Sequence, residues 1–163
     1  CDIFNQKALQ RVYHLKKRQP AKPFSFICSD LKHISEYAQV TNYAYKTMKR
    51  LLPGPYTFIL PGSRLVPKIM LTKRKTVGIR VPQNNICLAI VQALGHPIIS
   101  TSVQTEDGED LGNPSLIDEY FGRIVDLVID GGTIVPEPSS VVSLVNDTIE
   151  LIRIGKGDVS AFQ

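Results

Sequence analysis

The chain has 163 residues, of which 43% are hydrophobic and 21% charged, the ordinary balance of a single globular domain spanning residues 1–163. No apolar run approaches the roughly 20 residues that a membrane-spanning helix needs, and charges near the start occupy the place of a signal-peptide core. We therefore expect a cytoplasmic protein that does not contact a membrane. Cys1, Cys28 and Cys87 are far apart and form no CxxC pair, which argues against a zinc site or a disulfide framework.

The net charge of +4 conceals an uneven distribution along the chain. Residues 1–80 hold 16 Lys and Arg against 3 Asp and Glu, a net charge of +13, whereas residues 81–163 hold 3 against 12, a net charge of −9. The basic residues are clustered, as Lys16-Lys17-Arg18, Lys49-Arg50 and Lys73-Arg74-Lys75. A solvated basic surface or a helix C-terminus explains some of these residues, but the clustering favours an anionic ligand.

The first part of the chain is predicted to alternate helices and strands. The expected elements are a helix from the cap Asn5 to Arg18, a strand over Phe24–Cys28, a helix from Ser29-Asp30 to Tyr37, a helix that begins at Thr41 or Asn42 and ends at Pro53, a strand over Tyr56–Leu60 and a helical turn over Pro67–Leu71.

The stretch from Lys75 to Ser102 predicts a strand-helix-strand unit. Thr76–Val81 is β-branched and alternating, Asn85 can cap a helix that Gly95 closes, and Pro97 opens a second apolar run. If the two strands are parallel, their carboxyl ends lie at one edge of the sheet, where open α/β sheets bind ligands. The residues there are Arg80, Ser100, Thr101 and Ser102. A guanidinium and hydroxyl groups suit a polyanionic or carboxylate ligand, although strand-end serines also form turns.

The remaining segments predict one loop, one helix and three strands. The acidic loop Val103–Gly112 lacks the glycine and the terminal glutamate of a calcium loop, so we expect no metal site there. The elements after it are a helix from Asn113-Pro114 with Leu116, Ile117, Tyr120 and Phe121 on its inner face, a buried strand over Val125–Asp130, and a hairpin of Ser140–Val145 and Thr148–Ile154 around Asn146-Asp147. The chain contains no Walker loop, GxGxxG, HExxH or GxSxG motif.

A series of short motifs occurs in the order typical of one protein family. They are Lys16-Lys17-Arg18, Lys22-Pro23, Pro53-Gly54-Pro55-Tyr56-Thr57, Thr76-Val77-Gly78-Ile79-Arg80-Val81-Pro82, Ser100-Thr101-Ser102, Pro138-Ser139-Ser140-Val141-Val142 and Ile152-Arg153-Ile154-Gly155. In this order they resemble the YrdC/YciO family, and in particular its YciO branch, over nearly the whole chain. The resemblance implies an α/β fold around a twisted mixed sheet, with flanking helices and a positively charged concave face.

The resemblance also implies an activity. The best-understood members of the family are threonylcarbamoyl-AMP synthases, nucleotidyltransferases that combine L-threonine, bicarbonate and ATP and release pyrophosphate during tRNA modification. The implied nucleotide contacts are Arg18, Lys22, Thr76, Ser102, Asn113 and Arg153, and the implied threonine contacts are Arg80, Ser100 and Ser139. Lys16 and Arg18 match the family's basic pair, which we expect to supply charge during catalysis. Mg²⁺ is expected to arrive with the ATP phosphates, without a permanent cofactor.

Three differences separate the chain from the synthases. It begins after the family's amino-terminal Pro-Thr-Asp-Thr-type strand, Gln104 stands where synthases have Asn, and Ile27 stands at a histidine position near the threonine. These differences predict an incomplete pocket and a synthase activity that is weak, altered or lost. The alternatives are a protein that binds double-stranded RNA or tRNA through Lys73, Arg74 and Lys75, and a degenerate nucleotide-binding or interaction domain. We further expect Lys16, Arg18 and Arg80 to line one concave surface.

Overall fold

The computed structural model describes residues 1–17, 24–71, 74–105 and 107–162. The chain divides into two compact units. The first comprises Cys1–Ser100 and Ser139–Gln163, and the second comprises Thr101–Pro138. Arg18, Lys22 and Lys73, three of the predicted site residues, lie outside the described residues.

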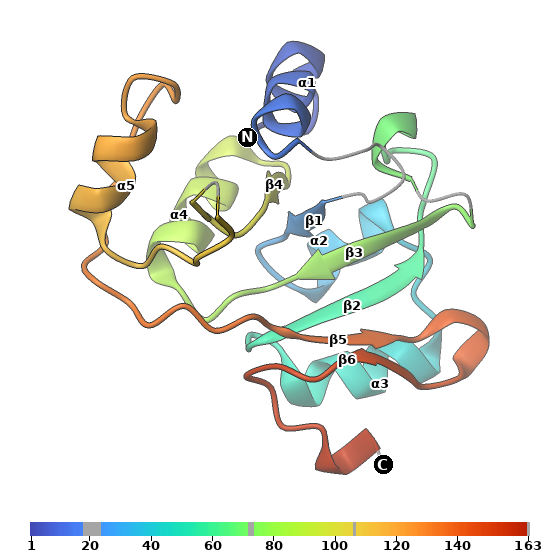
Figure 1. Cartoon of the computed structure of the whole chain (residues 1–163). Coiled ribbons are helices and arrows are strands. Elements are labelled where there is room, and N and C mark those ends of the chain that lie inside the picture. The colour runs from blue at the N-terminus through green and yellow to red at the C-terminus, as the bar shows by residue number, and fades with distance from the viewer. Residues whose placement is uncertain (18–23, 72–73, 106, 163) are drawn as a thin grey trace. The chain divides into compact units, whose positions relative to one another are not determined.

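A six-stranded sheet with the order β4-β1-β3-β2-β5-β6 organises the first unit (Figure 1). Its strands are β1 (Ser25–Ile27), β2 (Tyr56–Pro61), β3 (Thr76–Arg80), β4 (Ile98–Ser100), β5 (Ser140–Ser143) and β6 (Glu150–Arg153). The pairs β1–β3 and β2–β5 are parallel, and the other three pairs are antiparallel. The predicted mixed sheet is therefore confirmed.

The helices begin at side-chain caps, as the sequence predicts. The helices of the first unit are α1 (Gln6–Leu15), α2 (Leu31–Tyr37), α3 (Asn42–Leu51) and α4 (Asn85–Leu94), with the short 3-10 turns η1 (Lys68–Met70), η2 (Val145–Asp147) and η3 (Ser160–Phe162). Asn5, Asp30 and Thr41 each accept a backbone N–H in the first turn of their helix. None of the helices in the described ranges combines the length and the apolar character that crossing a bilayer requires.

Two helix boundaries differ from the prediction. The cap of α4 is Asn84, whose Oδ1 accepts the backbone N–H of Cys87, and not Asn85, which is the first helical residue. The first helix ends at Leu15 instead of Arg18, because Lys17 takes a left-handed backbone conformation with φ 46°. Gly95 closes α4 with φ 73°, as predicted.

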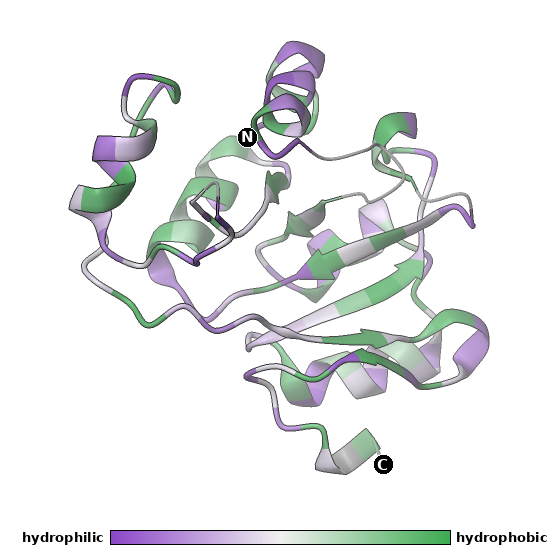
Figure 2. Cartoon of the chain, viewed as in Figure 1, coloured by the Kyte–Doolittle hydropathy of each residue, from purple (hydrophilic) through white to green (hydrophobic). Residues whose placement is uncertain are grey.

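One face of the sheet forms the hydrophobic core of the first unit. Phe26, Phe58, Ile79 and Val142 come from four neighbouring strands and are all fully buried. Helices α2 and α3 lie behind the sheet in Figure 1 and add their own buried side chains to this core. Because side chains alternate along a strand, the residues directly before and after each of these four point to the opposite face. Figure 2 shows the hydrophobic colour toward the arrowhead of β2 and the hydrophilic colour at the turn before β3.

The predicted strand-helix-strand unit forms as β3, α4 and β4, but the condition that its two strands are parallel is not met. β1 lies between β3 and β4 and runs parallel to β3 but antiparallel to β4, so β3 and β4 run in opposite directions. Ser25 is level with both Gly78 and Ser100, whereas Ile27 is level with Arg80 and Ile98. Arg80 and Ser100 therefore do not end at the same edge. The strand that sets this orientation is more than 50 residues earlier in the chain than α4, beyond the reach of a local pattern.

The carboxyl-terminal hairpin forms, but its loop is longer than the predicted two-residue turn. The innermost pair of β5 and β6 is Ser143 with Glu150, so residues 144–149 form the loop, which contains η2. Asn146 and Asp147 in this loop both have positive φ, 59° and 57°. A bulge interrupts the pairing of β5 and β6 between Val141 and Val142, so that Val141 stands opposite Arg153 while Val142 stands opposite Leu151.

The second unit consists of the acidic loop, one helix and an extended segment. Gln104 and Asp110 form an antiparallel bridge within the loop, and Asn113 caps α5 (Pro114–Phe121) as predicted. The predicted inner face of α5 is not buried, since the helix has no buried residue. The predicted strand over residues 125–130 is also wrong, because this segment pairs with no other among the described residues and leaves Leu127 75% exposed. The apolar residues of this segment are therefore not sufficient to form a strand when no other strand pairs with it.

Candidate functional site

The candidate site lies on the face of the sheet opposite the aromatic core, which we call the polar face. Ser25 stands opposite Ser100 on one side and Gly78 on the other, so these three positions share a face. A Cβ added at Gly78 would meet Ser25 Oγ at 3.2 Å and Thr57 Cγ2 at 3.3 Å, which places Thr57 on the same face. Arg80 joins them because it lies two residues after Gly78 on β3. This face thus carries hydroxyl groups, a bare glycine and a cation.

Arg80 is a partly desolvated cation with an unused hydrogen-bond donor. Its Nε is buried and has no hydrogen-bond partner among the residues that the structure describes. Burial lowers the pKa of the Arg80 guanidinium, and the positive charge of Arg153 lowers it further, whereas Cys87 raises it. Two arginines thus act on each other here, and Arg80 retains an unused donor. An anion at this position would relieve the repulsion and accept the hydrogen bond.

Arg153 starts a short hydrogen-bond chain across the sheet. Its Nε and Nη2 donate to the carbonyl oxygen of Ser139 at 3.1 and 2.7 Å, and Nη2 also donates to Ser139 Oγ at 3.3 Å. Ser139 Oγ lies 2.7 Å from Thr57 Oγ1 on β2. Both hydroxyl residues are buried, whereas Arg153 is exposed. These hydrogen bonds therefore link the exposed guanidinium of Arg153 to the buried hydroxyls of Ser139 and Thr57 on the polar face.

The segment after β6 is held against the sheet beside Arg153. Ser140 Oγ donates to the Gly157 carbonyl oxygen at 2.6 Å and accepts the Gly155 N–H at 3.0 Å. The Tyr56 hydroxyl donates to the Asp158 carbonyl oxygen at 2.9 Å. A Cβ at Gly157 would come within 2.5 Å of the Tyr56 ring, so only glycine allows this approach. These contacts fix the backbone that carries Arg153.

Two further residues lie next to Arg80. Cys87 is in the first turn of α4, and burial raises the pKa of its thiol although the charge of Arg80 opposes the increase. Ile27 stands level with Arg80 on the neighbouring strand and is buried. The family resemblance implies a histidine at the position of Ile27. In this chain Arg80 therefore has an aliphatic neighbour there, which neither accepts nor donates a hydrogen bond.

The structure brings several predicted site residues to the polar face. They are the predicted threonine contacts Arg80, Ser100 and Ser139 and the predicted nucleotide contacts Thr76 and Arg153. Lys16 is the C-cap of α1 and is half-buried. With Arg18 outside the described residues, a shared surface for Lys16, Arg18 and Arg80 stays a prediction.

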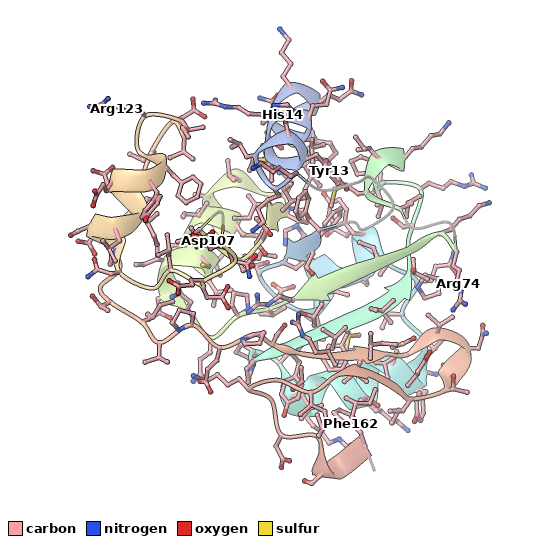
Figure 3. The ribbon with its side chains drawn as sticks, viewed as in Figure 1. Tyr13, His14, Arg74, Asp107, Arg123 and Phe162 are labelled. Atoms are coloured by element: carbon pink, nitrogen blue, oxygen red, sulfur yellow. The ribbon has the colours of Figure 1, made fainter. Side chains whose placement is uncertain are left out.

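Four other predicted residues belong to the second unit or to the turn before β3. Ser102 and Asn113 belong to the second unit, where Asn113 Oδ1 accepts the Ser115 N–H at 2.9 Å. Arg74 and Lys75 are exposed in the turn before β3, whereas Arg80 is the last residue of this strand. Figure 3 labels Arg74 in that turn. Arg74 and Lys75, two of the predicted RNA contacts, thus lie at the opposite end of this strand from the predicted threonine contact Arg80.

The sequence analysis missed Ser25, Thr57 and Gly78 as site residues. Each lies next to a buried apolar residue of its strand, Phe26, Phe58 or Ile79. This placement is visible in the sequence, but it assigns the three positions to one site only when the order of the strands is known.

Comparison with known proteins gives relatives over nearly the whole chain. A family model named Sua5_yciO_yrdC and described as "Telomere recombination" matches residues 1–155. The protein YciO of Escherichia coli K12, described as uncharacterized, is 39% identical over 99% of this chain and 80% of its own length. A protein of Methanocaldococcus jannaschii named "Putative threonylcarbamoyl-AMP synthase" is 34% identical over 95% of this chain and 73% of its own.

Solved structures agree with these relatives. The crystal structure of E. coli YciO superimposes with a TM-score of 0.93 over 100% of this chain and 80% of that one, at 39% identity. The crystal structure of P. abyssi Sua5 complexed with L-threonine has a TM-score of 0.86 at 25% identity, over 95% of this chain and 46% of that one.

Proposed function

Since this chain belongs to the Sua5/YciO/YrdC family, we propose that it binds L-threonine and ATP on the polar face and forms threonylcarbamoyl-AMP with bicarbonate. The observation that carries this proposal is the unpartnered Nε of Arg80 beside the second cation, Arg153. Two neighbouring arginines suit a ligand with a negatively charged group, and both proposed substrates have one.

Two relatives support the choice of substrates. The M. jannaschii relative is named as a putative threonylcarbamoyl-AMP synthase, and the Sua5 of P. abyssi was crystallised with L-threonine. Arg80, Ser100 and Ser139 are the residues through which the family resemblance implies threonine binding, and in this chain they share the polar face.

The proposed reaction requires alignment and charge neutralisation more than covalent catalysis. The threonine amine and bicarbonate form a carbamate with loss of water. A carbamate oxygen then bonds to the α-phosphorus of ATP, and the bond from that phosphorus to the bridging oxygen breaks to release pyrophosphate. Arg80 would hold the threonine carboxylate, while Arg153 and the basic pair Lys16 and Arg18 would neutralise phosphate charge. Mg²⁺ would enter with the ATP phosphates.

Two substitutions predict slower turnover than in the synthases. Gln104 is one methylene longer than the family asparagine, so its amide group cannot occupy the same place, and Ile27 removes a histidine next to Arg80. Misplacement of a reacting group by about 1 Å can lower a rate by ~100-fold. Replacing Gln104→Asn should therefore raise the rate of pyrophosphate release.

The test is whether pyrophosphate release depends on both L-threonine and bicarbonate. We expect release only with ATP, L-threonine and bicarbonate together, accompanied by threonylcarbamoyl-AMP detected by mass spectrometry. Pyrophosphate release that does not depend on L-threonine, or L-threonine binding without formation of threonylcarbamoyl-AMP, would contradict the proposed synthase activity.

A second candidate function, double-stranded RNA or tRNA binding, has one supporting observation. Arg74 and Lys75 are exposed at the outer end of β3, away from Arg80, where a phosphate backbone could contact them (Figure 3). Contacts to phosphates carry no base information, so binding should be independent of sequence and weaken steeply as salt rises. Replacing Lys73, Arg74 and Lys75 together by Ala should lower the affinity for a duplex RNA and flatten its salt dependence. Unchanged binding would exclude this patch.

A further inference from the structure

We propose that Thr57 is a positioning residue for substrate binding: it donates its hydroxyl hydrogen to Ser139 Oγ and so directs the Ser139 hydroxyl hydrogen toward the ligand. The inference rests on the proposed function, because it concerns how the polar face holds the L-threonine carboxylate. Thr57 is not among the residues for which the family resemblance implies a role.

Counting hydrogens shows that the Thr57–Ser139 pair keeps one free donor. Thr57 and Ser139 share one hydrogen bond of 2.7 Å, although each hydroxyl has a hydrogen to donate. Ser139 Oγ is the one partner of Thr57 Oγ1 among the described residues. The pair therefore has one more hydrogen than its own bond uses. A buried donor left without an acceptor is costly, and a ligand with an acceptor oxygen at this position removes that cost.

Arg153 limits how the two hydroxyls can be arranged. Its Nη2 donates to Ser139 Oγ at 3.3 Å and so uses one lone pair of that oxygen. If Thr57 also donates to Ser139 Oγ, both lone pairs of that oxygen are used. The remaining Ser139 hydrogen can then only point away from Thr57 and Arg153. Ser139 thus becomes an obligate donor, suited to a carboxylate and unsuited to an ammonium group.

The surroundings of Thr57 hold its hydroxyl in this direction. Thr57 is 5% exposed and β-branched, so its side chain has few accessible rotamers. A Cβ at Gly78 would lie only 3.3 Å from its methyl group Cγ2. The absence of a side chain at Gly78 therefore lets the Thr57 methyl group turn toward β3 while the hydroxyl faces Ser139 on the other side. An alanine at Gly78 would press on this methyl group and disturb the same hydrogen bond.

The experiment measures L-threonine binding by calorimetry for matched variants of the full chain. Thr57→Val keeps the branched shape and removes the hydroxyl, and it should weaken binding about tenfold, the effect of losing one oriented hydrogen bond. Thr57→Ser retains the hydroxyl and should restore most of the affinity. Thr47→Val is the control, since Thr47 is equally buried and donates to the Tyr43 carbonyl oxygen within α3, on the core side of the sheet. This control should leave the affinity unchanged.

A double-mutant cycle separates positioning from a general structural effect. If Thr57 acts through Ser139, Thr57→Val should cause no further loss of affinity in a Ser139→Ala background. Equal losses in both backgrounds, or an unchanged affinity in Thr57→Val, would overturn the inference while the proposed function stands. An unaltered chain that does not bind L-threonine would overturn both. Thermal unfolding of each variant excludes a loss of affinity caused by unfolding.

Discussion

The two faces of the sheet are built from the same strands but have opposite properties. On β2 and β3, Phe58 and Ile79 are fully buried on the core face, whereas Thr57, Gly78 and Arg80 alternate with them on the polar face. The core face gains stability from apolar burial, and the polar face keeps a desolvated cation whose Nε has no partner in the described part of the chain. A fold that tolerates this cost on one face has that face available for a ligand. The comparison predicts that stability depends on one face and binding on the other.

The largest expected effect is on the core face. Phe58→Ala removes a fully buried aromatic ring and should lower the free energy of unfolding by about 3–5 kcal/mol, measured by urea denaturation. Phe4→Ala is the control, because Phe4 is 54% exposed, and it should cost less than about 1 kcal/mol. Equal losses in the two variants would show that the core face does not dominate stability.

The next effect belongs to the polar face. Arg80→Met retains an unbranched side chain and removes the charge, and it should weaken L-threonine binding by about 100-fold, the consequence of losing a charge-assisted contact. The unfolding midpoint should stay the same or rise, because the replacement ends both the desolvation of the guanidinium and its repulsion by Arg153. A loss of stability comparable with that of Phe58→Ala would contradict the division between the two faces.

The sequence predicts much of the first unit because its signals are local. Helix caps at Asn5, Asp30 and Thr41, the left-handed Gly95 and the Asn146-Asp147 turn are each encoded within a few residues. The family resemblance added the assignment of Arg80, Ser139 and Arg153 to one ligand-binding site. No single sequence pattern in the chain supports that assignment.

Strand direction and segment pairing could not be predicted in the same way. The orientation of β4 depends on its partner β1, and the exposed segment of residues 125–130 depends on the absence of any partner strand in the described residues. Thr57 was overlooked for a related reason, since its role depends on a hydrogen bond to a residue 82 positions later. Each of these features follows from long-range pairing.

Cys87 provides a smaller effect, which reports the charge of Arg80 from the polar face. Burial raises the pKa of the Cys87 thiol, so the pH midpoint of its alkylation by iodoacetamide should lie above that of a free cysteine. Arg80 partly opposes this increase, and Arg80→Met should therefore move the midpoint to still higher pH. Mass spectrometry of the Cys87 peptide follows the alkylation of this thiol alone. A change in the access of iodoacetamide to the thiol alters the rate by the same factor at every pH, so it leaves the pH midpoint unchanged. A midpoint that moves to lower pH would show that the guanidinium does not stabilise the thiolate.

The smallest expected effect on stability comes from Ser25→Ala. Ser25 lies on the polar face between Ser100 and Gly78, and its hydroxyl has no hydrogen-bond partner among the described residues. Removing a half-buried hydroxyl that makes no bond should change the free energy of unfolding by less than about 0.5 kcal/mol. Its neighbour Phe26 faces the core and is fully buried, so Phe26→Leu should cost more than 1 kcal/mol, roughly the penalty of a change of shape in a packed core. Urea denaturation of the two variants compares adjacent residues on opposite faces of one strand. A larger loss of unfolding free energy in Ser25→Ala than in Phe26→Leu would mean that the polar face contributes to stability. This result would contradict the division of stability and binding between the two faces.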